Sequence, residues 1–141
     1  MAKNVMRRIA NQSAFYPFLG LLAAILIART YVYLGGNLGL GYDGIVFHHI
    51  FLGIIIVVVS GFVFFAFNRK LAANKRAMDA MAFTFGFGTG LITDETNFLV
   101  SIGQYYSLVN YYNPLNFYVD AAFILLSFSI LLFSLFSKRF R

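Results

Sequence analysis

Two pairs of neighbouring ionisable residues interrupt apolar sequence: His48-His49 and Asp94-Glu95. Ionisable groups at the depth of a bilayer are costly, so they usually mark a functional site or an internal pairing. Imidazole and carboxylate groups are also the side chains that bind zinc, iron, manganese and copper. The two pairs therefore predict either a divalent metal site or a set of buried ion pairs.

The composition of the chain predicts a membrane protein. Of its 141 residues 60% are hydrophobic and 11% are charged, with a mean hydropathy of +0.77, whereas soluble domains carry about 25% charged residues. Apolar segments cover residues 15–33, 45–67, 78–100 and 116–136, and each is close to the roughly 20 residues that a transmembrane helix needs. We therefore predict an all-α membrane protein, a bundle of four transmembrane helices that forms a single domain over residues 1–141. The chain has no cysteine, which excludes disulfides and thiolate sites.

The basic residues predict the orientation of these helices. Ten of the eleven precede the first segment, separate the second from the third, or follow the fourth, and an even number of crossings places them all on one side. They are Lys3, Arg7, Arg8, Arg69, Lys70, Lys75, Arg76, Lys138, Arg139 and Arg141. By the positive-inside rule both termini are cytoplasmic, and we expect a multi-pass protein of the plasma membrane. The net charge of +6 thus reflects topology, and no nucleic-acid partner is expected.

The first segment has a competing interpretation as a signal peptide, because positive residues precede its apolar core. No cleavage site of small residues follows, since Arg29, Thr30 and Tyr31 come next. We interpret the segment as a helix. Arg29 then lies inside the outer boundary, where it either extends toward the headgroups or pairs with a carboxylate.

Every predicted helix carries an ionisable group at a similar level, about one or two turns from its outer end. These groups are Arg29, His48 and His49, Asp94 and Glu95, and Asp120. Their shared level predicts one cluster, in which helical spacing directs His49, Asp94 and Asp120 inward and leaves His48 and Glu95 on the flanks. The candidate ligands of a divalent zinc, iron, manganese or copper ion are thus His48, His49, Asp94, Glu95 and Asp120.

Small and polar residues at helical spacing predict which faces pack together. In the third segment they are Gly86, Gly90, Asp94, Asn97 and Ser101. Gly86 and Gly90 have the spacing that permits close approach of helices in membranes. The corresponding residues are His49, Gly53 and Ser60 in the second segment, and Asn116, Asp120, Ser127 and Ser134 in the fourth.

Several familiar chemistries do not fit the sequence. A ferritin-like di-metal site needs Glu-x-x-His pairs, but Phe98 stands three residues after Glu95. The chain has neither a His-Glu-x-x-His zinc motif nor a phosphate-binding loop that ends in Gly-Lys. No catalytic residues are assigned, and we do not expect an enzyme.

The ordered motifs resemble a family of small, uncharacterised prokaryotic integral membrane proteins with four helices. Residues 48–53 fit His-His-x-x-x-Gly, and residues 85–95 fit Phe-Gly-x-Gly-x-Gly-Leu-x-x-Asp-Glu. The likeness covers roughly Phe47 to Asp120, and it departs at Tyr105-Tyr106, where the family pattern has Tyr-Trp. It implies no established activity, but it implies that the two ionisable pairs occur together.

Two functions follow from these observations. The first is a small membrane protein that binds a metal or another cation through the cluster near its outer face. The second is a non-catalytic accessory subunit of a larger membrane enzyme complex, of the oxidase or monooxygenase type, in which the cluster is a structural ion-pair network. The expected partners are the lipid bilayer and either other membrane subunits or a second copy of the chain.

Overall fold

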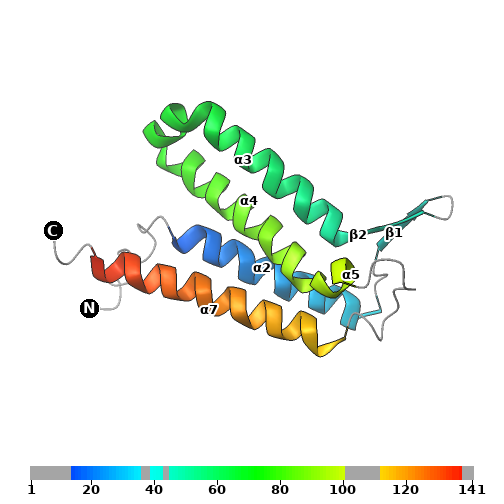
Figure 1. The fold of residues 1–141 in the computed structure, drawn as a ribbon. Helices are drawn as coiled ribbons and strands as arrows, with labels where there is room; N and C mark the ends of the chain where they lie inside the picture. Colours follow the sequence, from blue (N-terminus) through cyan, green and yellow to red (C-terminus); the bar gives the residue numbers. More distant parts are fainter. Residues whose placement is uncertain (1–13, 36–38, 43–44, 101–111, 138–141) are drawn as a thin grey trace.

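The computed structural model describes residues 14–35, 39–42, 45–100 and 112–137, with helix and strand labels as in Figure 1. The helices are α2 (Phe15–Tyr33), α3 (His49–Ala73), α4 (Lys75–Asp94), α5 (Thr96–Val100) and α7 (Pro114–Ser137). Three of them are long and apolar enough to cross a membrane, namely α2, α3 and residues Pro114–Phe136 of α7. The predicted helical fold with membrane-capable segments is thereby confirmed.

Residues suited to helix starts precede α4 and α7. The side chain of Asn74 accepts a hydrogen bond of 3.2 Å from the N–H of Ala77 in the first turn of α4. The side chain of Asn113 accepts one of 2.9 Å from the N–H of Leu115 in α7. Pro114 is the first helical residue there, at a position where the proline's missing N–H has no helical partner to lose.

The second helix begins and ends later than predicted. Residues Ile45–His48 form strand β2, which pairs antiparallel with β1 (Gly39–Tyr42), so the predicted helix start at residue 45 is wrong. Branched and aromatic residues suit such an extended segment. At its other end α3 continues to Ala73, with non-helical backbone at Phe67. Only Asn74 separates α3 from α4, so the predicted connection over residues 68–77 is also wrong.

The third predicted segment, residues 78–100, starts earlier and is interrupted. Lys75 begins α4, and the backbone at Glu95 (φ −125°, ψ 26°) separates α4 from α5. Unlike α2, α3 and α7, the helix α4 does not qualify as membrane-capable by length and composition. Its first turns carry Lys75, Arg76 and Asp79. That α4 and α5 together form a fourth membrane span stays a prediction.

Glycines bring α4 into backbone contact with both α2 and α3. A Cβ atom added at Gly86 would lie 2.0 Å from the carbonyl oxygen of Pro17, and one at Gly90 would lie 2.6 Å from that of Leu21. On another side of α4, a Cβ at Gly53 would lie 2.7 Å from the Gly88 carbonyl oxygen. Side chains at these positions are therefore excluded, and the prediction of close packing through Gly86 and Gly90 is confirmed.

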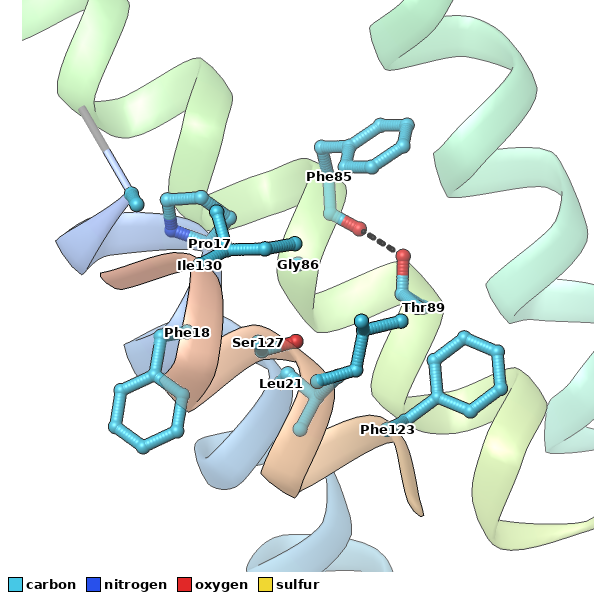
Figure 2. Close-up of a pocket in the computed structure, with 11 residues that line it drawn as sticks. Pro17, Phe18, Leu21, Phe85, Gly86, Thr89, Phe123, Ser127 and Ile130 are labelled. Carbon is cyan, nitrogen blue, oxygen red and sulfur yellow. Dashed lines mark hydrogen bonds between the residues drawn. The ribbon is translucent and has the colours of Figure 1, made fainter. Parts of the chain in front are cut away.

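The packing around α7 is looser. Across Figure 1 the helices follow in the order α3, α4, α2 and α7, and most residues of α7 are exposed. A cavity of about 430 Å³ lies among α2, α4 and α7, with Phe18, Leu21, Thr89, Phe123 and Ser127 in its wall (Figure 2). A second cavity of about 480 Å³ lies between α2 and α7 beside Arg29 and Asp120. The fourth predicted segment is confirmed as a helix, with a start two residues earlier.

Candidate functional site

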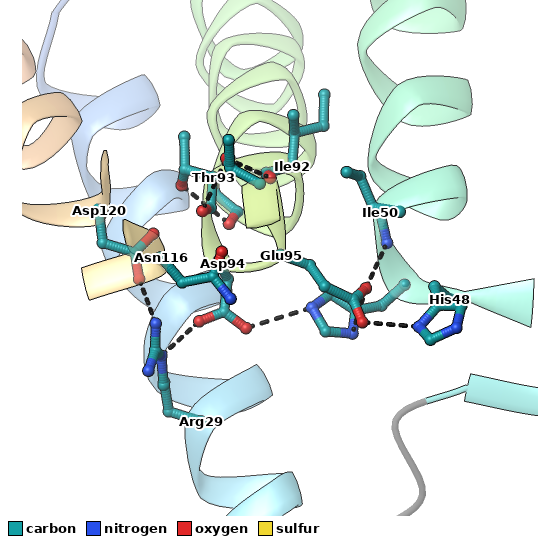
Figure 3. Close-up of polar contacts among 12 residues, drawn as sticks. Arg29, His48, Ile50, Ile92, Thr93, Asp94, Glu95, Asn116 and Asp120 are labelled. Atoms are coloured by element: carbon teal, nitrogen blue, oxygen red, sulfur yellow. Dashed lines mark hydrogen bonds and ion pairs between the residues drawn. The ribbon is translucent and has the colours of Figure 1, made fainter. Parts of the chain in front are cut away.

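Arg29 links three helices at the hairpin end of the molecule, the end where β1 and β2 lie (Figures 1 and 3). Its Nε–H donates to Oδ1 of Asp94 at 2.5 Å, and its Nη2–H donates to Oδ2 of Asp120 at 2.8 Å. The guanidinium therefore joins α2 to α4 and to α7. Of the two alternatives that the sequence left for Arg29, the structure shows pairing with carboxylates.

Asp94 occupies the centre of the network. It is the last residue of α4, and its exposed fraction is 0%. While one carboxylate oxygen accepts from Arg29, the other lies 3.2 Å from Nε2 of His49 at the start of α3. One buried side chain thus connects α2 and α3 through α4.

Glu95 lies at the break between α4 and α5 and is equally buried. Its Oε1 accepts a hydrogen bond of 2.7 Å from Nδ1 of His48, and its Oε2 lies 3.4 Å both from Nδ1 of His49 and from the backbone nitrogen of Ile50. His48, the residue before α3, makes no side-chain cap of its own. Glu95 supplies the negative group that the N-terminus of a helix favours.

The hydrogen bonds around His49 bear on the charge of the cluster. Both of its ring nitrogens lie within 3.4 Å of carboxylate oxygens. Ionised carboxylates only accept, so a neutral imidazole satisfies one of these contacts and an imidazolium satisfies both. Among the residues that the structure describes, one guanidinium faces three carboxylates in this network, which leaves a deficit of two positive charges when both imidazoles are neutral. Two imidazolium protons or one divalent cation would remove that deficit.

A second polar contact joins α5 to α7 beside the ionic network. The backbone N–H of Asn97 donates to the side-chain oxygen of Asn116 at 2.5 Å, and both residues are buried. Next to it the ring of Phe98 lies against His48, with ring centroids 4.4 Å apart and ring planes tilted by 32°. This contact covers one face of the imidazole with an apolar surface.

Asp120 lies at the α7 end of the network, and its two carboxylate oxygens differ in their contacts. Oδ2 accepts from Arg29, whereas Oδ1 is buried and has no hydrogen-bond partner among the described residues. The hydroxyl of Thr93, which faces Asp120, donates to the carbonyl oxygen of Gly90. Figure 3 shows Asp120 and His48 at opposite ends of the network, with Arg29 next to Asp120.

The five residues predicted as ligands lie in one network, but the predicted inward and flanking positions are partly wrong. His48 and Glu95, predicted on the flanks, are 8% and 0% exposed, while the side chain of His49, predicted inward, is 19% exposed. His48 belongs to a strand and not to a helix, and the break at Glu95 removes the rotation that a continuous helix would impose. Both departures bring the flanking side chains inward.

The donor atoms in this arrangement contact one another. Among the described residues no three or more His, Asp or Glu side chains have the arrangement of an assembled metal site. The donor types nevertheless suit a transition metal, because neutral imidazole and carboxylate are its usual protein ligands. A metal would therefore have to replace protons between the histidines and the carboxylates.

Two contributions to the site were not predicted from the sequence. The backbone N–H of Ile50 contacts Glu95, and Asn97 pairs with Asn116. The asparagines lie on the predicted polar faces of their helices, which was the available signal. No motif marks the N–H of Ile50.

Comparisons of the chain with protein-family models, with curated proteins and with solved structures find no match. The resemblance to small prokaryotic membrane proteins stays a prediction. The function is therefore argued from the geometry of the site.

Proposed function

We propose that the protein is a four-span protein of the plasma membrane with both termini in the cytoplasm, and that its ionic network is a cation site near the outer face. The topology is supported by three membrane-capable helices and by the basic residues at the α3–α4 turn. In this topology α4 and α5 form the fourth span. The helices α2, α3 and α7 shield Asp94, at the C-terminal end of α4, from lipid.

The topology is testable by single cysteines, because the natural chain has none. Lys70 and Tyr112 are both exposed. Lys70 lies near the end of α3 and Tyr112 lies two residues before the start of α7, and these two helix ends are at opposite ends of the molecule (Figure 1). In intact cells a membrane-impermeant maleimide should label Tyr112→Cys, and it should label Lys70→Cys only after the membrane is permeabilised. The reverse pattern would contradict the proposed orientation.

The cation site is supported above all by the charge deficit of the network. Three buried carboxylates face one guanidinium, and two imidazoles complete the set at 2.7–3.4 Å. With both imidazoles neutral, the described part of this cluster has two uncompensated negative charges, which is costly in a buried site. We propose that a divalent transition metal supplies the two positive charges in place of two imidazolium protons, which it displaces from the histidines.

The proposed ligands are His48, His49, Asp94 and Glu95. Asp120 belongs to the site in another way, since it holds the guanidinium that pairs with Asp94. When bound, the metal would neutralise the charge of the carboxylates. The proposal assigns it this structural role and no catalytic one. The protein residues hold the donor atoms at one level and, through Phe98, limit contact with water at His48.

Elemental analysis of the purified protein tests this site. Wild-type protein incubated with zinc or manganese and then desalted should retain one metal ion per chain. His49→Ala and Glu95→Gln should lose it, whereas Asp120→Asn, which keeps all four proposed ligands, should retain it. Retention should also fall as the pH is lowered, because protons compete for the imidazoles. Metal-free wild-type protein at neutral pH would refute the proposal.

A second function is favoured by the pairing of each carboxylate in the network with a cationic or imidazole side chain of the same chain. Every carboxylate accepts from Arg29 or a histidine, and large apolar surfaces of α3 and α7 are exposed. These features suit a non-catalytic subunit of a larger membrane complex, held together by ion pairs. Its signature would be co-purification with larger membrane proteins in mild detergent, without bound metal.

A further inference from the structure

The turn between α3 and α4 concentrates positive charge at the end of the molecule opposite the hairpin (Figure 1). Four exposed cations lie within eight residues: Arg69, Lys70, Lys75 and Arg76. Lys75 forms an ion pair with Asp79 and also lies 5.3 Å from the ring centre of Tyr16. Among the described residues Arg69 and Arg76 have no ion-pair partner, so two guanidinium groups are available to an anion.

An apolar groove begins directly beside this basic turn. A cavity of about 470 Å³ lies between α3 and α4, with Phe64, Phe65, Met78 and Met81 in its wall. A Cβ atom added at Gly61, which also lines it, would meet nothing within 4 Å. Farther along, the backbones of the two helices touch at Gly53 and Gly88 and close the groove. Its volume is in the range of small-molecule sites.

We propose that the basic turn and this groove form a binding site for an anionic phospholipid. Arg69 and Arg76 would bind the phosphate of the headgroup, because guanidinium groups bind phosphate in bidentate fashion. One acyl chain would occupy the groove between α3 and α4. A phospholipid is the bilayer component that combines a phosphate with acyl chains, and basic groups at the membrane surface favour anionic lipids.

The position of the turn relative to a bilayer agrees with this occupant. The part of α3 before its non-helical residue Phe67 begins at His49 and corresponds to about 27 Å of helix, close to the roughly 30 Å of hydrocarbon. When α3 crosses a membrane, its last residues therefore lie among headgroups while the groove lies among acyl chains. The proposal depends on α3 as a membrane span and is independent of the cation site at the other end.

Native mass spectrometry of the detergent-solubilised full chain, with phosphatidylglycerol or phosphatidylcholine added, tests the headgroup contact. Wild-type protein should retain phosphatidylglycerol preferentially. Arg69→Gln and Arg76→Gln should each weaken retention about fivefold. Arg139→Gln is the control, because it removes the same charge from the C-terminal tail. Equal retention of both lipids by wild type, or an equal loss in all three variants, would overturn the proposal.

The groove is tested separately from the charge. Gly61→Leu adds a side chain to the groove at a position where a Cβ atom meets nothing within 4 Å, and Ala66→Leu also introduces a leucine, at an exposed position of α3. Retention of phosphatidylglycerol should fall in Gly61→Leu and persist in Ala66→Leu. Glycerol phosphate, which has the headgroup chemistry without acyl chains, should not displace the lipid at equal concentration. Unchanged retention in Gly61→Leu, or full displacement by glycerol phosphate, would overturn the assignment of an acyl chain to the groove.

Discussion

Different kinds of contact hold together the two sides of the helical assembly: close backbone packing on one side and polar contacts on the other. Where α4 meets α2 and α3, glycines allow backbone to approach backbone and leave no room for a Cβ atom. On the other side, α7 is held by polar contacts of Asp120 with α2 and of Asn116 with α5, and cavities of about 430 and 480 Å³ remain beside it. Steric fit thus fixes one side, and a few polar contacts near the hairpin end fix the other.

The largest effect is expected where the backbones touch. Gly86→Val should destabilise the protein by about 3 kcal/mol or more, because its Cβ would overlap the carbonyl group of Pro17, which cannot move aside. Gly61→Val is the matched control, since its site is open. Thermal unfolding in detergent should show a large loss for Gly86→Val alone. Equal midpoints for the two variants would contradict the steric account of the α2–α4 contact.

A smaller but still substantial loss of stability is expected when the guanidinium group of Arg29 is removed. Arg29→Met leaves Asp94 and Asp120 without their shared partner, and breaking a buried pair typically costs about 3–5 kcal/mol. The guanidinium side chain retains 27% exposure, so we expect about 2–3 kcal/mol.

A second substitution distinguishes loss of charge pairing from loss of packing. Asp120→Asn in the Arg29→Met background removes one uncompensated charge and should restore part of the stability. The unfolding free energies of the two single variants and the double variant give the coupling between the sites. Strict additivity of the two effects would show that the ion pair does not hold α7.

The asparagine contact should contribute less than the ion pairs. Asn116→Ala removes the side-chain oxygen that accepts from the buried N–H of Asn97, which should cost about 1–3 kcal/mol. Ser129→Ala, which removes a bond to the carbonyl of the same helix on an exposed face, should cost below about 0.5 kcal/mol. Chemical unfolding of both variants measures the difference, and a larger loss for Ser129→Ala would contradict the role of Asn116.

The smallest effect is expected from filling the cavity beside α7. Ser127→Val places methyl groups into the cavity of about 430 Å³ and should stabilise the protein by about 0.5–1 kcal/mol. Ser129→Val, on the exposed face of α7, should be nearly neutral. A loss of stability in Ser127→Val would mean that this side is as closely packed as the glycine contacts.

The cluster could be predicted from the sequence because the number of residues from the end of a membrane helix determines how deep in the bilayer a side chain lies. Arg29, Asp94 and Asp120 stand at similar distances from the ends of their segments, so they meet at one level. The glycine face of α4 was predictable for the same reason, since spacings of four residues return to one side of a helix.

The strand and the helix break could not be predicted in this way. An apolar run such as residues 45–67 suits either a strand or a helix, and its composition does not reveal that residues 45–48 pair with β1. At the break, Glu95 contacts His48 and the start of α3, which lie more than forty residues away along the chain and which local sequence does not reveal. Tertiary contacts therefore decided the details of the site.

Calorimetric titration of zinc into the purified protein tests the cation site most directly. Measurements in buffers of different ionisation enthalpy report the protons released for each metal ion bound. The account predicts binding with release of protons, up to two for each zinc ion, as the metal replaces the protons between the histidines and the carboxylates. Absence of binding, or binding without proton release, would contradict a site in which one divalent cation exchanges for those protons.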